Sequence, residues 1–502
     1  MADVLLVSTY ELGHQPFSIA SAWTLLEAAG HTVRAVDTSV ETVDDELLAW
    51  ADLVAISVPM HTALRLGVEV ARRAQALRRD RHICLFGLYA WLNAESLLPG
   101  TADSVVGGEF EAALVQLANA LASGEVADLP GVTTSSTLAR AGGSAAPPVL
   151  DRLAFAVPRR DGLPDLPRYA RLVGLEPGAG RIAGYVEASR GCLHRCRHCP
   201  ITPVYDGRFF VIPTEVVLAD AEQQVLAGAR HITFGDPDFL NGPRHSMTIV
   251  RRLHAAHPDL TFDVTTKIEH ILRHREVFRE LSALGCVFVV SALESLSDRV
   301  LEKLAKGHTR SDVFEAFRIL DEAGITLRPS LVPFTPWATL EDYLDIVDFA
   351  SHDARIGTID PIQLAIRLLV PPGSALVQPL RSGKNVDELI ELRPWFGPLA
   401  PDQFHHVWTH PDPRMDALHG QVQRAVEQGA RRSLPDRDAI FEIRELAYDT
   451  AGRRAPPRSP GGDERLSPKL SEPWFCCAEP SVDQLHHVTS RRSPERPTNA
   501  DG

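Results

Sequence analysis

Three cysteines fall within eight residues of one stretch, at Cys192, Cys196 and Cys199. Thiols at this C-x-x-x-C-x-x-C spacing can hold a metal centre in two ways. With His194 or His198 as a fourth donor, they would complete a closed Cys₃His zinc site. A [4Fe–4S] cluster takes four thiolates when it is fully ligated, so three cysteines would leave one iron open to an outside ligand.

The position of these cysteines favours the cluster. They follow the stretch YVEASRG (185–191), which predicts a strand, so the thiols should lie at the carboxyl end of that strand. Folds that alternate strands and helices in a barrel keep their active sites at that edge. A structural zinc ion has no reason to prefer that place, and no second C-x-x-C pair follows downstream.

The elements that would position the loop predict a partial barrel. Between residues 181 and 375, strand and helix patterns alternate about six times. The expected strands lie at 185–191, 231–239, 260–267 and 286–295, then at 325–334 and within 359–374. Six units are fewer than the eight that close a (β/α)₈ barrel, so we expect an α/β fold with an open (β/α)₆ barrel here.

The cysteine spacing after the first strand of such a barrel resembles the radical S-adenosylmethionine (SAM) superfamily. The resemblance implies that Cys192, Cys196 and Cys199 ligate a [4Fe–4S] cluster whose open iron binds the amino and carboxylate groups of SAM. It also implies that an electron from the cluster cleaves the sulfonium and yields a 5′-deoxyadenosyl radical. One residue departs from the family pattern, because His198 stands where an aromatic residue usually precedes the third cysteine.

Residues at the ends of later strands also resemble the family. In the family, residues at these strand ends approach the amino group, the ribose or the carboxylate of SAM. By that analogy the implied cofactor-binding residues are Gly235, Asp236, Lys267, Glu294 and Ser295. The segment GDPD (235–238) lacks the glycine–glycine–glutamate of many members, and KGHT (306–309) follows a pattern common in cobalamin-type members.

The first 130 residues predict a separate doubly wound domain. Strand patterns at 4–10, 31–38, 53–60 and 82–90 alternate with helical runs, which indicates a parallel sheet with a ligand crevice at the carboxyl ends of the strands. The expected lining of that crevice is 12–17, 61–62, 87–93 and 107–109. The alternative is a sheet whose loops only pack on the next domain.

A Rossmann-like domain before a radical SAM barrel resembles the cobalamin-binding subclass of the superfamily. The resemblance implies cobalamin as a third cofactor. The D-x-H-x-x-G motif that supplies a lower axial histidine is absent, as in many members of the subclass, so no axial ligand can be named. A vestigial domain without a cofactor is the alternative.

The remaining chain divides into a linker, a helical region and a tail. Residues 131–180 carry many breakers and predict a linker, 376–450 are mostly helical, and 451–502 begin as a Pro/Arg/Gly/Ser-rich tether. The tether leads to PWFCCAEP (473–480), which resembles the tail of the radical SAM family named for CUAEP or CCAEP, where U is selenocysteine.

Cys476 and Cys477 in this tail are predicted to be catalytic. Adjacent cysteines make a poor structural disulfide, because the ring they close is strained. A redox or soft-ligand role suits them better, and selenocysteine in relatives would favour chemistry over packing. The alternative is that both act as small hydrophobic residues. The remaining Cys84 and Cys286 lie in predicted strand regions and are expected in the core.

Composition limits the partners and the compartment. The net charge of −14 argues against bulk capture of nucleic acid, and no apolar run is long enough to span a membrane. The N-terminal residues predict a strand and lack the basic flank of a signal peptide. We therefore expect a cytoplasmic protein that acts on a small molecule and takes electrons from a donor such as flavodoxin or ferredoxin.

Three functions follow from these patterns. The first is a radical SAM enzyme, with cobalamin for methyl or alkyl transfer to a small molecule. The second is radical alkylation of a soft metalloid, an arsenic or selenium species, held by the vicinal tail thiols. The third is a non-catalytic zinc- or cluster-binding protein.

Overall fold

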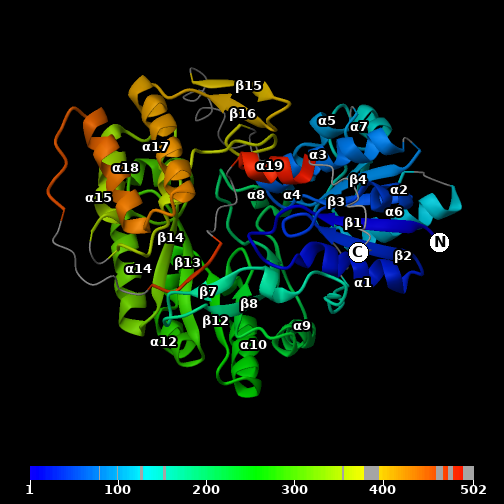
Figure 1. Ribbon diagram of the computed structural model, residues 1–502, viewed down its shortest axis with the longest axis horizontal. Helices are drawn as coiled ribbons and strands as arrows, with labels where there is room; N and C mark the ends of the chain where they lie inside the picture. The colour runs from blue at the N-terminus through cyan, green and yellow to red at the C-terminus, as the bar shows by residue number, and fades with distance from the viewer. Residues whose placement is uncertain are drawn as a thin grey trace, which may run out of the picture. The chain divides into compact units, whose positions relative to one another are not determined.

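The structure, a computed structural model, covers the chain in two compact units, residues 1–168 with 478–502 and residues 169–477 (Figure 1). It describes all residues except 79, 99, 125–127, 151–153, 353–354, 378–394, 459–466, 473–478 and 490–502. The predicted α/β class, with a Rossmann-like first domain and a partial barrel, is confirmed. Among the described residues no helix combines the length and apolarity needed to cross a membrane.

The first unit is built on one six-stranded sheet. Five strands run parallel, and the last pairs antiparallel with its neighbour. In spatial order they are β2 (Thr32–Asp37), β1 (Asp3–Ser8), β3 (Leu53–Ser57), β4 (His82–Phe86), β5 (Ser104–Val106) and β6 (Val132–Thr134). The last strand falls inside the segment predicted as a linker; it is short, and the neighbouring strand β5 supplies its hydrogen bonds.

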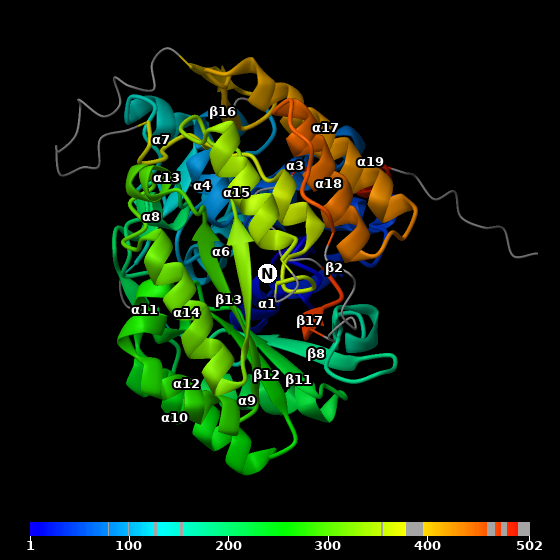
Figure 2. The same ribbon diagram turned by 90° about the vertical axis from the view of Figure 1, so that its left-hand side faces the viewer.

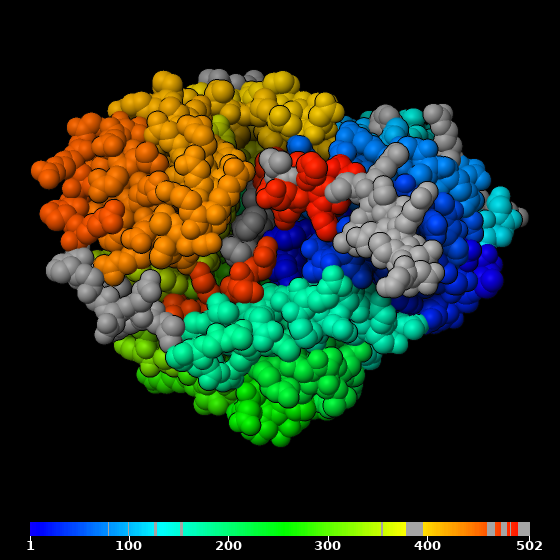
Figure 3. Space-filling view, viewed as in Figure 1, coloured from blue at the N-terminus to red at the C-terminus, as the bar shows by residue number. Residues whose placement is uncertain are grey.

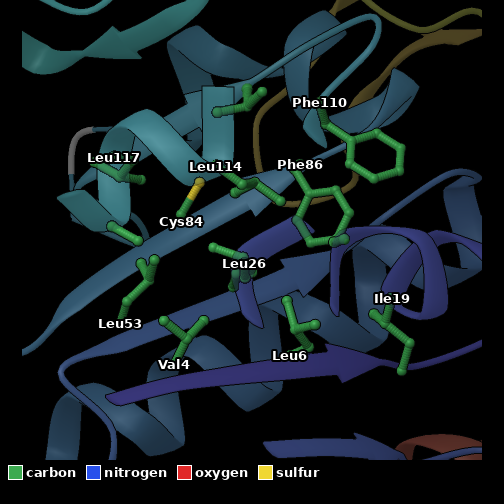
Figure 4. Close-up of a cluster of buried hydrophobic side chains, with 14 of the residues drawn as sticks. Val4, Leu6, Ile19, Leu26, Leu53, Cys84, Phe86, Phe110, Leu114 and Leu117 are labelled. Carbon is green, nitrogen blue, oxygen red and sulfur yellow. The ribbon is translucent and has the colours of Figure 1, made fainter. Parts of the chain in front are cut away.

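Helices follow the strands of this unit along the chain, and one more lies near the C-terminus. They are α1 (Phe17–Ala28), α2 (Asp45–Trp50), α3 (His61–Leu77), α4 (Leu88–Leu92), α5 (Ala94–Leu97), α6 (Glu111–Ser123), α7 (Ser135–Arg140) and α19 (Val482–Thr489). Alternate residues Val4 and Leu6 of β1 pack with Leu26 and Leu114 in the core shown in Figure 4. Their neighbours on β1 are also fully buried, so both faces of the sheet are covered. Cys84 lies in this core, as predicted.

The second unit contains the barrel-like sheet. Its strand order is β14 (Thr326–Leu331), β13 (Cys286–Glu294), β12 (Thr261–Thr265), β11 (His231–Phe234), β8 (Arg181–Val186), β7 (Arg171–Val173) and β17 (Lys469–Leu470). The first five are mutually parallel, while β7 and β17 extend the β8 edge in antiparallel fashion. Cys286 begins β13 and is buried, as predicted.

The sixth strand expected within 359–374 is reduced to one parallel bridge between Phe334 and Arg367. The short 3₁₀ helix η3 (Pro361–Ala365) takes up the start of that segment. Prolines at both ends of the apolar run explain the difference, since proline cannot donate a ladder hydrogen bond.

Helices line the outside of this sheet (Figure 2). They are α8 (Ile201–Tyr205), α9 (Thr214–Leu226), α10 (Pro243–Ala256), α11 (Ile268–Arg273), α12 (Arg275–Ala283), α13 (Asp298–Lys303), α14 (Arg310–Ala323) and α15 (Leu340–Ala350). Capping boxes at Thr309 and Thr339 fix the starts of α14 and α15, because each threonine and the aspartate three residues later satisfy one another's backbone amides.

The region predicted as helical near the C-terminus contains two long helices and a hairpin. The hairpin strands are β15 (Phe396–Ala400) and β16 (His405–Trp408), and the helices are α17 (Pro413–Arg431) and α18 (Asp436–Thr450). The space-filling view shows α17 and α18 as the orange surface of this unit (Figure 3). Trp408 of the hairpin packs in a core with Trp337 and Leu368.

Candidate functional site

The cysteine loop leaves the carboxyl end of β8 and is closed by a small hairpin. The strands β9 (Ser189–Gly191) and β10 (Phe209–Val211) pair antiparallel at its base. Next to them, the backbone N–H of Cys192 donates a 3.0 Å hydrogen bond to the carbonyl of Arg208. The loop that bears Cys192, Cys196 and Cys199 is therefore tied at both ends to the edge where the sequence placed it.

The three thiols form one donor set, in which Cys192 and Cys199 are partly buried. All three are free, and Cys196 is buried. Burial, together with the charge of Cys196, raises the pKa of Cys192 to about 11 and that of Cys199 to about 12. Cys192 and Cys199 would therefore ionise together only beside a strong positive centre. This soft donor set fits three irons of a [4Fe–4S] cluster, with the fourth iron left open.

A buried ion pair stands beside the thiols. Nζ of Lys306 lies 3.1 Å from Oε1 of Glu294, and Nε2 of His198 lies 3.1 Å from the same oxygen. Burial opposes both charges, yet Lys306 and His198 hold the pKa of Glu294 below its usual value. Glu294 and the thiolates of Cys196 and Cys199 in turn raise the pKa of Lys306. A cation is thus fixed beside the proposed cluster ligands.

The backbone at Glu294 is strained. Its φ is 64°, in the left-handed region, and the β13–β14 register shifts between Ala292 and Glu294. A non-glycine residue in this conformation costs about 1–3 kcal/mol, and such strain clusters at functional sites. The N–H of Val332 fixes the turn by donating to the Glu294 carbonyl over 2.9 Å. The next residue, Ser295, is buried and accepts a hydrogen bond from the N–H of Ser297.

At the end of β11, Gly235 and Asp236 support the loop mechanically. A Cβ on Gly235 would lie 1.8 Å from the Tyr185 hydroxyl oxygen, so only glycine fits against that ring. Both carboxylate oxygens of Asp236 accept hydrogen bonds, from the N–H of Ala188 and the hydroxyl of Ser189. Burial raises the pKa of Asp236 to about 6. These contacts hold the backbone that leads from β8 into the cysteine loop.

Lys267 lies between β12 and α11, where it occupies the N-cap position of the helix, and it is buried with Glu269 as its ion-pair partner. The nearby His308 of the KGHT segment is also buried, and burial together with the charges of Lys306 and Lys267 lowers its pKa to about 4. A neutral imidazole and two lysines therefore share this end of the sheet. The sequence pointed to Lys267 and to the KGHT segment but not to the burial of His308.

Three further side chains meet at this edge, and the sequence did not single them out as a group. His194 belongs to the cysteine loop, Asp238 follows β11, and His270 lies on α11. Their candidate ligand atoms all lie within 4.8 Å of one another. His194 was considered only as a zinc ligand beside the cysteines. A signal was present, because all three positions fall just after strands that should be neighbours in a parallel sheet.

In the first unit, polar groups gather where β1 and β3 end. Glu11 accepts hydrogen bonds from the N–H of Phe17 and from the hydroxyl of Ser18, which also contacts Ser57 at 2.7 Å. Burial raises the pKa of Glu11 to about 7. The chain order reverses between β1 and β3, and ligands of open α/β sheets bind at such a switch point.

The predicted catalytic pair Cys476 and Cys477 lies outside the described residues. Glu479 is the next residue that the structure describes. It contacts His61 at the start of α3 and lies 3.4 Å from Arg65. All three residues belong to the first unit.

Residues 186–350 match the family described as "Radical SAM superfamily". The protein contains a radical SAM domain. This domain implies a [4Fe–4S] cluster and SAM as cofactors, and it indicates an enzyme. The matched segment includes the cysteine loop, Glu294 and Lys306.

Curated relatives carry related domains. The chain is 27% identical over 332 residues to hopanoid C-3 methylase of Methylococcus capsulatus, which covers 64% of this chain and 62% of that protein. It is 28% identical over 228 residues to a tRNA-2-methylthio-N(6)-dimethylallyladenosine synthase of Chlorobium luteolum, covering 41% of this chain and 49% of that protein. The chain thus spans 62% and 49% of the length of these two relatives.

Two solved enzymes share the fold over more than the radical SAM domain. TsrM of Kitasatospora setae, solved with tryptophan and a SAM analogue, aligns with a TM-score of 0.62 over 85% of this chain and 89% of its own, at 18% identity. OxsB, solved with aqua-cobalamin and SAM, aligns with a TM-score of 0.64 over 90% of this chain and 71% of its own, at 15% identity. At these identities the likeness concerns the fold.

Proposed function

We propose that this protein is a cobalamin-dependent radical SAM enzyme that transfers a methyl or alkyl group to a small molecule. The supporting observation is the extent of the fold similarity. Alignment over 85% and 90% of the chain reaches well beyond residues 186–350, and both aligned enzymes are named as a radical SAM methyltransferase or a cobalamin-dependent enzyme.

In the radical SAM domain, Cys192, Cys196 and Cys199 would hold the cluster. The cluster supplies the electron that cleaves SAM when both are bound. Lys306 offers a fixed positive charge to the SAM carboxylate, and Glu294 keeps that lysine charged and in place. Gly235 and Asp236 serve by holding the loop, while Lys267 and Ser295 are proposed as further polar groups near SAM.

In the first unit, cobalamin would sit over the carboxyl ends of β1 and β3. The residues there fit a corrinoid, whose rim carries amide side chains that donate and accept hydrogen bonds. Ser8 Oγ is fully buried and has no hydrogen-bond partner among the described residues, and Glu11 and Ser57 add further polar groups. Cobalamin supplies a transferable methyl group when it is bound. No axial ligand is assigned.

Electron paramagnetic resonance of the anaerobically reconstituted protein tests this proposal. We expect a reduced-cluster signal that shifts when SAM is added, and a cob(II)alamin signal in the same desalted sample. The variant Cys192→Ala/Cys196→Ala/Cys199→Ala should lose the cluster signal and keep the cobalt signal. The matched control Cys84→Ala/Cys286→Ala, which also removes buried thiols, should keep both.

Each outcome decides a separate part of the proposal. A cluster without cobalt would overturn cobalamin-dependent transfer and leave a radical SAM enzyme of another type. Stoichiometric zinc at the three cysteines, with no cluster, would overturn the assignment of the cysteine loop itself.

A further inference from the structure

Three side chains at the carboxyl edge of the second sheet point their ligand atoms at one place. His194 comes from the cysteine loop, Asp238 from the segment between β11 and η2 (Phe239–Asn241), and His270 from α11. Asp238 is completely buried and His270 nearly so. None of the three is part of the thiol set described above.

The distances suit a shared ion. Asp238 Oδ2 lies 2.9 Å from Nδ1 of His270 and 3.3 Å from Nε2 of His194. Two ligand atoms that each lie about 2.1 Å from one ion, at tetrahedral or octahedral angles, are roughly 3.0–3.4 Å apart. The carboxylate oxygen therefore has the spacing to each imidazole nitrogen that a common metal ion would impose.

Two of these atoms have no hydrogen bond to any residue that the structure describes. They are Nε2 of His194 and Oδ2 of Asp238. The other oxygen of the same carboxylate is well satisfied, because it accepts from the hydroxyl of Thr266 over 2.7 Å and from the N–H of Leu240, and it also lies 3.1 Å from Nδ1 of His270. A buried carboxylate oxygen without a donor is costly. Thr266 and Leu240 hold Oδ1, so Oδ2 lies close to both imidazoles, where a shared cation would satisfy it.

The outer partners also match a metal site. Nδ1 of His194, the nitrogen that faces away from the group, lies 3.5 Å from Oε2 of Glu269. Glu269 is itself held by Lys267. A metal-bound histidine usually gives its second nitrogen to a carboxylate, which fixes the ring and strengthens it as a ligand.

We propose that His194, Asp238 and His270 bind one divalent transition-metal ion, separate from the iron–sulfur cluster. Two imidazoles and one carboxylate suit Zn²⁺ or Fe²⁺. His194 is two residues from both Cys192 and Cys196, and its Nε2 lies 3.3 Å from Oδ2 of Asp238. The ion would therefore tie the cysteine loop to the end of β11 and to α11.

Metal analysis of the cluster-loaded protein tests this site. After reconstitution of the cluster, the protein is given Zn²⁺, passed over a chelating resin and analysed for zinc and iron together. We expect one zinc ion per chain beyond the cluster iron. In Asp238→Asn and in His194→Gln the retained zinc should fall at least about tenfold, while the cluster iron stays.

His274→Gln is the matched control, because this histidine ends α11 beside His270 but is not part of the group. It should keep the zinc. His194→Gln covers the case in which Asp238→Asn does not fold, since His194 is partly exposed and lies in a loop. Absence of zinc from the native protein, or zinc retained by a folded His194→Gln protein, overturns the proposal. Because iron is read in the same sample, failure of the cluster is seen separately.

Discussion

Glu479 Oε1 lies 2.8 Å from Nε2 of His61, a residue 418 positions earlier in the chain. Glu479 belongs to the C-C-A-E-P motif, and its other oxygen lies 3.4 Å from Arg65. His61 is fully buried at the start of α3, directly after β3. This contact fixes the beginning of α19 against α3, at the edge of the first sheet where its crevice was predicted.

Glu479→Gln should loosen α19 without unfolding the unit. Glu479 is about half exposed, so the loss of stability should be below about 1 kcal/mol. Hydrogen exchange followed by mass spectrometry should show faster exchange of the 482–489 amides. Asp483→Asn, an acidic residue on the same helix, is the control and should leave that exchange unchanged. Equal exchange in native and Glu479→Gln proteins would mean that the contact does not hold the helix.

For the buried Glu294–Lys306 pair, we expect the loss of one partner to lower the free energy of unfolding more than the loss of both charges. Lys306→Met leaves a buried carboxylate without its main partner, so the free energy of unfolding should fall by about 3 kcal/mol. Adding Glu294→Gln removes that uncompensated charge and should restore most of the loss. Anaerobic urea unfolding followed by circular dichroism measures both steps.

Arg299→Met controls for the loss of a cation from α13, where this arginine is exposed, and should change the stability by no more than about 0.5 kcal/mol. A double variant no more stable than Lys306→Met would show that the loss comes from lysine packing rather than from the unpaired charge.

The raised pKa of Glu11 predicts that the first unit becomes less stable as pH rises. The folded carboxyl holds its proton up to pH 7, whereas the unfolded one releases it around pH 4.5. The native state therefore binds more protons between these values, and the free energy of unfolding should fall across this window by at most about 3 kcal/mol. Glu11→Gln should flatten the dependence.

Thermal unfolding at a series of pH values from 4.5 to 7.5 makes this comparison. Glu46→Gln, an exposed glutamate on α2, is the control and should keep the native slope. If Glu11→Gln and the native protein lose stability in parallel as pH rises, Glu11 does not carry the dependence.

The alternation of strand and helix patterns was enough to predict both sheets, because buried strands that alternate with amphipathic helices occur mainly in parallel sheets. The prediction of a sixth barrel strand was wrong for a local reason. Residues 359–374 are apolar, but they carry prolines that interrupt the hydrogen-bond ladder. The short strands β6 and β7 could not be predicted, since each depends on a neighbouring edge strand for its hydrogen bonds.

Spacing along the chain identified the cysteines, and strand ends identified Glu294. The group of His194, Asp238 and His270 had only the weak signal of three positions after neighbouring strands, because its members are separated by more than thirty positions and meet through the register of β8, β11 and β12. The hydrogen bonds of Asp236 to the loop likewise depend on tertiary placement. A sequence shows which residues stand at an edge, but not which of them turn toward each other.

The vicinal thiols Cys476 and Cys477 give the last prediction. If they form a soft-ligand pair, the cluster-loaded protein should bind trivalent arsenic tightly, because two neighbouring thiolates chelate a soft centre. Cys476→Ser/Cys477→Ser should weaken that binding at least about tenfold, since two hydroxyl oxygens cannot replace two thiolates at a soft centre. The control Cys84→Ala/Cys286→Ala removes the same number of thiols from the core and should bind as the native protein does. Arsenite titration by calorimetry measures all three proteins, and equal affinity in the serine variant would end the soft-ligand hypothesis while leaving the cysteines of the cluster loop unaffected.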